Sequence, residues 1–365
     1  ARRGVNRRWV GLYNRQVVPR LGLVPKARPV PLFFVELTNH CNLECSMCPR
    51  PTLQRELGHM DWDLYCRIID NIARLGGRRL GLNRFGESLL YPRFLDAVRY
   101  AKKAGIRHVS VVTNGTLLDG EMASEILDSG LDHIAVSLDT LDRDAYEEMR
   151  RGARLDEVVA NLDRFIEMRR QRGAARPQIQ INSVLVEEDL DQIRALFEKY
   201  QAHVDRIFLK PCARYGEGQD LSGDGVSRRR WLTCIQPWQR LNIFWDGEAT
   251  VCCGDVEGDL VVGNVKQASL EWLWLKSPRA SDIRRLHHRQ EFDTLPVCRR
   301  CDATNADFFE QAVEQLKRLY TAVGMGDRIL GLQNTMPLLR WHAQRGDVKV
   351  AQAAPDASIP EELEP

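Results

Sequence analysis

The chain has 365 residues, of which 44% are hydrophobic and 28% are charged, a composition that fits one large α/β domain with a smaller partner. Its net charge of +2 gives no argument for nucleic-acid binding, and it contains no run of about 18 apolar residues that would cross a membrane. We therefore expect neither a nucleic-acid partner nor a membrane-embedded chain.

The start of the chain and the cysteines indicate the compartment. The first residues carry many arginines and lack the apolar stretch of a secretory signal, although an arginine-rich transit peptide is an alternative. The ten cysteines cluster at short spacings, which in a reducing compartment is more typical of metal ligation than of disulfides. Both features predict a cytoplasmic protein whose cysteines hold metal.

After a basic segment at 1–30, which we expect to be helical, short apolar runs alternate with helical patterns. The predicted strands are 33–37, 79–83, 108–113, 132–138, 178–186 and 205–210. The predicted helices lie near 62–75, 92–104, 119–129, 155–171 and 189–200, and Asp61 caps the first. This alternation predicts a parallel sheet, either doubly wound or an incomplete barrel, with active residues at the carboxyl ends of its strands.

The second half of the chain changes in composition. Residues 213–228 are rich in Gly, Asp and Ser and predict a linker, and residues 229–301 are rich in cysteine. Short strand-like pieces at 241–245 and 249–253 precede a tryptophan-rich helix at 270–275. The domains we expect are 1–30, 31–225, 226–310, helices over 311–346 and a disordered tail at 347–365.

Three cysteines, Cys41, Cys45 and Cys48, form C-x3-C-x2-C directly after the first predicted strand. Three thiolates can hold three corners of a [4Fe–4S] cube and leave one iron open for a small molecule, whereas ferredoxins normally fill all four positions with cysteine. Zinc prefers closed tetrahedral sets that are commonly built from paired C-x2-C sequences. The unmatched trio favours a catalytic cluster, with a structural or zinc site as the alternative.

With these residues the chain resembles the radical SAM superfamily, whose members share a partial (β/α)6 barrel and bind S-adenosylmethionine (SAM) on the fourth iron. The resemblance places Met47 near the adenine. It also places Gly86, Glu87 and Ser88 in the turn that binds the methionine amino group, where Phe85 and Ser88 depart from the family's Gly and Pro. Further cofactor contacts that the resemblance implies are Thr113, Asn114, Ser137, Asp139, Arg150 and Asn182.

A second group, Cys234, Cys252, Cys298 and Cys301, has the spacing C-x17-C-x45-C-x2-C. It resembles the SPASM/twitch extension of the same family, which implies one auxiliary [4Fe–4S] cluster; a structural zinc site also fits the spacing. Four protein ligands would leave no open iron, so this cluster would conduct electrons or order the fold. The resemblance in spacing assigns Cys252 to the cluster and leaves its neighbour Cys253 free.

The spare thiols bear on the reaction. Cys253 is the first candidate for a hydrogen donor, because epimerases of the family return a hydrogen atom from a thiol to the substrate radical. Cys212, just past the sixth strand, is a second candidate, whereas Cys66 lies on an amphipathic helix and is expected in the core. The tryptophans expected in the core, and not in a binding cage, are Trp238, Trp245, Trp272 and Trp274.

The resemblance therefore implies hydrogen abstraction by a 5′-deoxyadenosyl radical from a small polar substrate. Our first hypothesis is epimerisation of a sugar or aminoglycoside in natural-product biosynthesis, with flavodoxin or ferredoxin as electron donor. The alternatives are dehydrogenation of a sugar or aminocyclitol alcohol, peptide maturation, which the roughly 30 residues before the first strand disfavour, and a non-enzymatic electron carrier, which the Gly-Glu-Ser and Thr-Asn-Gly sequences disfavour. The strand-end residues that either bind substrate or form ordinary salt bridges are Glu36, Asn83, Arg84 and Lys210.

Overall fold

The fold is given by a computed structural model that describes residues 27, 30–185, 189–212, 234–289, 291–299, 301–302, 315–316, 318–319 and 321. The predicted linker at 213–228 and the predicted tail at 347–365 lie outside these residues. So do nearly all of the N-terminal segment at 1–30 and of the helical stretch at 303–346. The domain boundaries that we drew from composition stay predictions.

Within the described residues, nine strands form one open sheet in the order β6-β5-β4-β3-β2-β1-β7-β8-β9. The first six strands run parallel and confirm the predicted ones, with ends that differ by up to two residues. They are β1 (Leu32–Val35), β2 (Arg79–Gly81), β3 (His108–Thr113), β4 (His133–Ser137), β5 (Gln178–Leu185) and β6 (Arg206–Pro211). This is the expected partial barrel.

The cysteine-rich segment extends the same sheet. Its first strand, β7 (Arg240–Ile243), pairs in parallel with β1, so that β1 lies between β2 and β7. The strands β8 (Glu248–Thr250) and β9 (Val261–Asn264) then add antiparallel. The two halves of the chain therefore share one hydrogen-bonded sheet.

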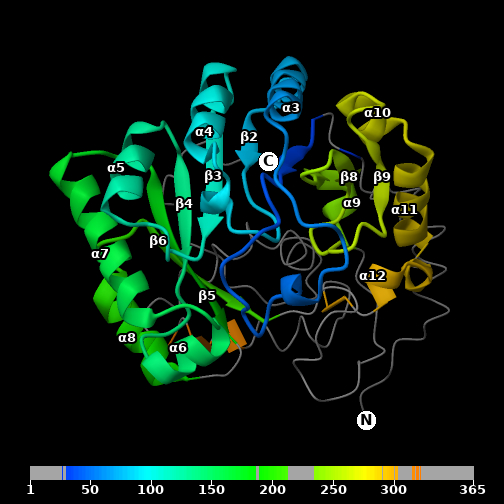
Figure 1. Cartoon of the computed structure of the whole chain (residues 1–365). Helices are drawn as coiled ribbons and strands as arrows, with labels where there is room; N and C mark the ends of the chain where they lie inside the picture. Colours follow the sequence, from blue (N-terminus) through cyan, green and yellow to red (C-terminus); the bar gives the residue numbers. More distant parts are fainter. Residues whose placement is uncertain are drawn as a thin grey trace, which may run out of the picture.

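Helices cover the sheet (Figure 1). Those that follow β1 to β5 are α3 (Trp62–Arg74), α4 (Phe94–Lys103), α5 (Gly120–Asp128), α6 (Arg143–Met149), α7 (Leu155–Gln171) and α8 (Leu190–Tyr200). Asp61 caps α3 as predicted, because its carboxylate accepts the N–H of Leu64. The pattern missed α6, a seven-residue helix that buries a single side chain, Tyr146.

The cysteine-rich segment adds α9 (Gln236–Gln239), α10 (Leu270–Leu275), α11 (Pro278–Arg289) and α12 (Pro296–Arg299). Short 3₁₀ turns are η2 (Arg50–Thr52), η3 (Ser88–Leu90) and η4 (Phe292–Thr294). In the described residues no helix is both long and apolar enough to span a membrane.

The core lies between the sheet and the helices. Side chains such as Ile134 and Val136 of β4 and Phe165 of α7 are fully buried, each worth about 1.5–3 kcal/mol relative to exposure. Three of the four tryptophans expected in the core are buried or half-buried, but Trp272 is 41% exposed. That prediction was wrong because α10 turns Leu270, Leu273 and Trp274 inward and Trp272 outward.

Candidate functional site

The first cysteine loop starts just beyond β1 and is held against the end of α6. The N–H of Glu44 donates to the carbonyl of Arg151 at 2.9 Å, and the N–H of Ser46 donates to that of Met149 at 2.8 Å. Within the loop, the N–H of Cys48 donates to the carbonyl of Cys45 at 3.0 Å and closes a tight turn. Contacts from a distant helix therefore fix a loop that has almost no regular structure of its own.

The three thiols of the loop lie close enough to influence one another. Burial is the largest cause that raises the pKa of Cys41, Cys45 and Cys48, and each thiol also feels a neighbouring thiolate of the trio. Such groups become thiolates only when a cation compensates the charge, as iron would. Among the described residues no three Cys, His, Asp or Glu side chains converge on a single-ion site. The buried trio fits a cluster, in which each cysteine holds a different iron.

The Gly86-Glu87-Ser88 turn packs directly on the segment that leads into the cysteine loop. A Cβ atom at Gly86 would lie 2.2 Å from the carbonyl oxygen of Thr38 and 2.7 Å from that of His40, so only glycine fits. The N–H of Glu87 donates to the carbonyl of His40 at 2.8 Å. Ser88, where the family has proline, donates its hydroxyl to the carbonyl of Leu82 and is buried. These contacts fix the turn against the segment that leads into the cysteine loop, and its contact with the cofactor stays a prediction.

Glu87 joins this turn to the end of β3. Its carboxylate accepts the N–H of Asn114 at 2.7 Å and that of Leu89 at 3.1 Å. Burial raises the pKa of Glu87, and these backbone donors partly offset the rise. The side chain of Asn114 in turn donates to Asn42, beside Cys41, at 2.9 Å. Thr113 accepts the N–H of Gly115 at 3.1 Å, so the predicted strand-end residues form a single support for the cysteine loop.

Asp139 and Arg150 form a buried ion pair below the cysteine loop. The guanidinium donates to both carboxylate oxygens, at 2.5 and 3.1 Å, and also reaches Cys45 Sγ at 3.9 Å. Asp139 also accepts the N–H of Val184 at 2.8 Å. The carboxylate of Asp139 thus has three protein donors. The ribose contact that we expect from Asp139 stays a prediction. The geometry adds a role in orienting Arg150 toward Cys45.

The other predicted cofactor residues lie at the same edge of the sheet. Ser137 ends β4, and Asn182 on β5 accepts a hydrogen bond from Gln180 at 2.5 Å. Met47 is half-buried and packs against the core between Cys45 and Cys48. Their contacts with the cofactor stay predictions.

The second group brings five thiols together, one more than the predicted ligand set. Burial raises the pKa of Cys234 to about 12, with further contributions from Cys253 and Cys298. The pKa of Cys252 is raised by burial and then by Cys253, Cys301 and Cys234. The N–H of Gly254 donates to Cys252 Sγ at 3.3 Å, a contact that stabilises a thiolate. These residues fit an auxiliary cluster with a thiol to spare.

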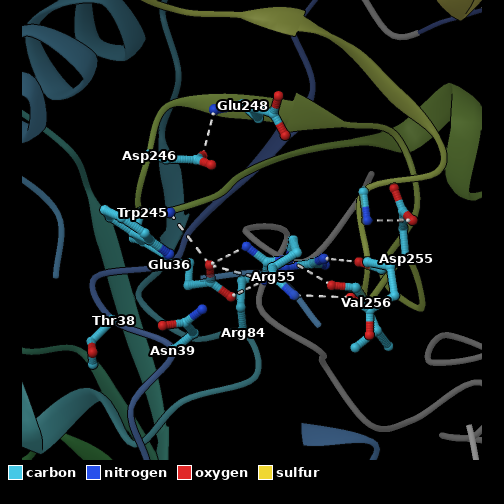
Figure 2. A network of polar contacts seen from close by, with 12 residues as sticks. Glu36, Thr38, Asn39, Arg55, Arg84, Trp245, Asp246, Glu248, Asp255 and Val256 are labelled. Carbon is cyan, nitrogen blue, oxygen red and sulfur yellow. Dashed lines mark hydrogen bonds and ion pairs between the residues drawn. The ribbon is translucent and has the colours of Figure 1, made fainter. Parts of the chain in front are cut away.

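Two arginines dock the loop after Cys252 onto the barrel (Figure 2). Arg84 donates to the carbonyls of Cys252 and Cys253 at 3.2 and 3.1 Å and to that of Asp255 at 2.9 Å. Arg55 donates to the carbonyl of Val256 at 2.7 Å and pairs with Glu36 at 3.2 Å, which also accepts the N–H of Trp245. We expected the strand-end residues either to bind substrate or to form salt bridges. Glu36 forms a salt bridge, and Arg84 binds backbone carbonyls.

Of the other strand-end candidates, Lys210 stands near the end of β6, two residues before the spare thiol of Cys212. Burial raises the pKa of Cys212, Lys210 lowers it, and Asp302 and Asp139 raise it. Cys212 is therefore close enough to feel the charges of both Asp139 and Asp302, the neighbour of Cys301.

Sequence reasoning missed one contact of the second group. Nε2 of His287 lies 3.4 Å from Cys298 Sγ, and its ring stacks on Phe292 with centroids 5.0 Å apart. Burial lowers the pKa of His287 to about 4, so the ring is neutral at pH 7. The sequence does hold a signal: two adjacent histidines stand in the last turn of α11, and the first of them, His287, stands eleven residues before Cys298 on the buried face of the helix, with Ala280 and Ile283.

An open parallel barrel with three cysteines after its first strand and a cysteine-rich extension of the same sheet defines an iron–sulfur enzyme. The family model described as "Radical SAM superfamily" matches residues 35–199, and that of the SPASM "Iron-sulfur cluster-binding domain" matches residues 234–302. The chain belongs to the radical SAM superfamily and carries a SPASM domain. Its cofactors are accordingly SAM, a SAM-binding [4Fe–4S] cluster and an auxiliary [4Fe–4S] cluster.

Two curated relatives share part of the sequence. The chain is 33% identical to the tungsten-containing aldehyde ferredoxin oxidoreductase cofactor-modifying protein of Pyrococcus furiosus over 165 aligned residues, and the alignment covers 45% of this chain and 46% of the relative. It is 33% identical to the GTP 3′,8-cyclase of Chlorobaculum tepidum over 155 aligned residues, and that alignment covers 42% of this chain and 46% of the relative. The chain thus spans about half the length of the curated relatives it matches.

Solved structures share the fold over most of the chain. BtrN in complex with AdoMet and 2-DOIA superposes with a TM-score of 0.53 at 17% identity, covering 75% of this chain and 94% of BtrN. Streptococcus suis SuiB bound to S-adenosylmethionine gives 0.57 at 18% identity, covering 74% of this chain and 71% of SuiB. At these identities the likeness shows the fold.

Proposed function

We propose that this radical SAM enzyme takes a hydrogen atom from a C–H bond of a small hydroxylated substrate and returns one from the thiol of Cys253, which epimerises the carbon. The observation that carries the proposal is the fifth thiol of the second group, since Cys234, Cys252, Cys298 and Cys301 complete the ligand set of one auxiliary cluster. Cys253 is half-buried beside them, and Arg84 fixes its carbonyl from the turn next to Gly86.

For the first half of the reaction we assign roles within the barrel. Cys41, Cys45 and Cys48 hold the cluster, the turn at Gly86 contacts SAM through its backbone, and these cofactors together supply the 5′-deoxyadenosyl radical that removes the substrate's hydrogen. A guanidinium nitrogen of Arg150 lies 3.9 Å from Cys45 Sγ and helps to hold this thiol in place.

The second half balances at Cys253. Its S–H bond breaks homolytically and the hydrogen forms a new C–H bond on the opposite face of the substrate carbon. This step is downhill because an S–H bond is weaker than the C–H bond it forms. The thiyl radical left on Cys253 takes up one electron and one proton to restore the thiol. A flavodoxin or ferredoxin is the class of donor that would supply the electron. The auxiliary cluster held by the adjacent Cys252 would conduct this electron to Cys253.

The polar groups near Cys212 support a hydroxylated substrate. The charges of Lys210, Asp302 and Asp139 all act on the Cys212 thiol just past β6, and such charged groups suit hydroxyl groups. This argument supports a sugar or aminocyclitol, with the origin in natural-product biosynthesis resting on the resemblance alone.

Dehydrogenation of an alcohol is the second candidate, because a cluster with four protein ligands has no open iron and suits electron uptake from a substrate radical. The cofactor-modifying and GTP-cyclising relatives, and the precursor peptide bound by SuiB, define further substrate classes for the same assay.

The test is incubation of the anaerobically reconstituted enzyme with SAM and dithionite in deuterated water. The substrate panel contains sugars, aminocyclitols, GTP and a peptide, and products are analysed by mass spectrometry. Epimerisation predicts 5′-deoxyadenosine and a product one mass unit heavier through a single solvent deuteron. Cys253→Ala should still form 5′-deoxyadenosine but give no deuterated epimer, whereas the control Cys66→Ala on α3 should behave as the unmodified enzyme. A product two mass units lighter would identify a dehydrogenase, and full epimerisation by Cys253→Ala would refute the role of this thiol.

A further inference from the structure

Arg84 is a buried cation without a carboxylate of its own. Its guanidinium donates to three backbone carbonyls, and its Nε has no hydrogen-bond partner among the described residues. The carboxylate that acts on it most strongly, Glu36, is already paired with Arg55 at 3.2 Å. An unpaired buried charge is costly, so its persistence in this site calls for a negative partner.

The negative groups around Arg84 indicate what this partner is. After Glu36, the groups whose negative charge acts on the guanidinium are Cys253, Asp255 and Cys252. Asp255 balances part of the charge: its carboxylate accepts from the neutral donors Thr250 Oγ1 and Leu260 N–H, and its carbonyl accepts from the guanidinium. The two thiols add to it, because in an iron–sulfur cluster ligated by four cysteines the thiolates and sulfides carry a net negative charge.

The guanidinium is also held rigidly. It lies 4.8 Å from the ring centroid of Phe85 and 5.0 Å from that of Phe244, and Arg55 covers the same Phe244 ring at 3.9 Å. Cation–π contacts in a desolvated site favour a fixed arginine over a mobile one. Figure 2 shows Arg55 and Arg84 side by side near Glu36. Because Arg84 stands two residues before Gly86, it ties the loop of the second cysteine group to the SAM-side turn.

We propose that Arg84 is the buried counter-charge and positioning residue of the auxiliary cluster. It neutralises part of the charge of the cluster held through Cys252 and fixes the Cys252–Cys253 carbonyls relative to the Gly86 turn. A cation at this place stabilises the reduced, more negative cluster and raises its reduction potential, as charge and hydrogen bonds near a cluster do. The proposal needs Cys252 as a ligand but stands whether or not Cys253 returns hydrogen.

The test compares Arg84→Gln and Arg84→Lys by a redox titration of the full-length holoenzyme, followed by electron paramagnetic resonance. Added SAM shifts the signal of the SAM-binding cluster and so separates it from the auxiliary one; protein with Cys41, Cys45 and Cys48 changed to alanine confirms the assignment. Arg84→Gln should make reduction of the auxiliary cluster at least tenfold less favourable, a fall of about 59 mV for one electron. Arg84→Lys, which keeps the charge, should stay near the unmodified potential but change the shape of the signal, because the three-carbonyl geometry is lost.

Arg170→Gln is the control, since this arginine is 72% exposed and pairs with Glu167 on α7. It should leave the potential unchanged. Loss of the auxiliary cluster from Arg84→Gln but not from Arg84→Lys would also support the counter-charge. Equal potentials in all variants, or equal loss of the cluster from both Arg84 variants with the SAM-binding cluster retained, would overturn it. Absence of an auxiliary cluster from the unmodified protein would refute the ligand assignment and, with it, this proposal.

Discussion

The Glu36–Arg55 pair should contribute strongly to the docking of the SPASM segment on the barrel. The side chain of Glu36 is 0% exposed and that of Arg55 is 10% exposed. Arg55→Met would leave the carboxylate with one weak donor, the N–H of Trp245 at 3.3 Å. Removing one partner of a buried pair costs about 3–5 kcal/mol when the other charge stays buried and uncompensated. Here the charge of Arg84 also acts on Glu36 and compensates part of it, so we expect a cost at the lower end of that range. The lost bond to the Val256 carbonyl lies within that range, since such contributions are not additive.

The decisive comparison is a second change in the same background. Glu36→Gln removes the buried charge while it keeps an acceptor for Trp245, so the double variant Glu36→Gln/Arg55→Met should be more stable than Arg55→Met alone. Replacing a buried pair by neutral groups is often close to neutral, whereas breaking it is not.

Thermal unfolding, followed by tryptophan fluorescence at one scan rate and equal iron content, measures the order of the variants. A single free energy is not defined for a chain with bound clusters, but the sign of the rescue does not depend on two-state behaviour. At about 2–4 °C per kcal/mol, Arg55→Met should lower the midpoint by at least about 6 °C. A loss below about 2 °C, or a double variant less stable than Arg55→Met, would show that Glu36 does not depend on Arg55.

Two further predictions concern the barrel. Gly86→Ala should abolish 5′-deoxyadenosine formation and lower stability by about 1–3 kcal/mol, because the new Cβ meets backbone oxygens that cannot give way. The control, Gly120→Ala at the start of α5, has its nearest neighbouring atom at 3.6 Å and should be neutral or stabilising. A SAM-cleavage assay compares the two variants, and an active Gly86→Ala enzyme would contradict the packing argument. Burial, and then Arg79, lower the pKa of His108 to about 4, against about 6.5 in an unfolded chain, so the neutral ring contributes no penalty above pH 6.5 but stability is lost as the pH falls from about 6.5 to about 4. His108→Asn should flatten this acid limb in melting curves, the exposed His203→Asn should not, and identical limbs for His108→Asn and the unmodified protein would refute the assignment.

The barrel strands could be predicted because the information is local. Runs such as His108–Thr113 and Gln178–Leu185 alternate with amphipathic helices, and the three cysteines after β1 lie within eight residues of one another. The helix α6 escaped because seven residues with one buried side chain give no periodic pattern.

The rest depends on contacts between distant parts of the chain. No local signal places β7 beside β1, and the carbonyls that bind Arg84 lie about 170 residues away in sequence, at separations of 168 to 171. A polar residue at a strand end therefore looks like a substrate ligand until its partner is known, as for Glu36 and Arg84. Trp272 was misplaced for a similar reason, because a six-residue helix has too few turns to define which side faces inward.

The position of β1 within the sheet sets the separation between the two redox centres. One edge of this strand pairs with β2, which leads to the SAM turn, and the other pairs with β7, which leads to the loop of Cys252. A slip of β7 by one residue would move that loop by about 3.3 Å along the strand and turn its side chains to the other face. Loops around the rim can thus vary, while the distance between the two cysteine groups stays fixed by backbone pairing in the middle of the sheet.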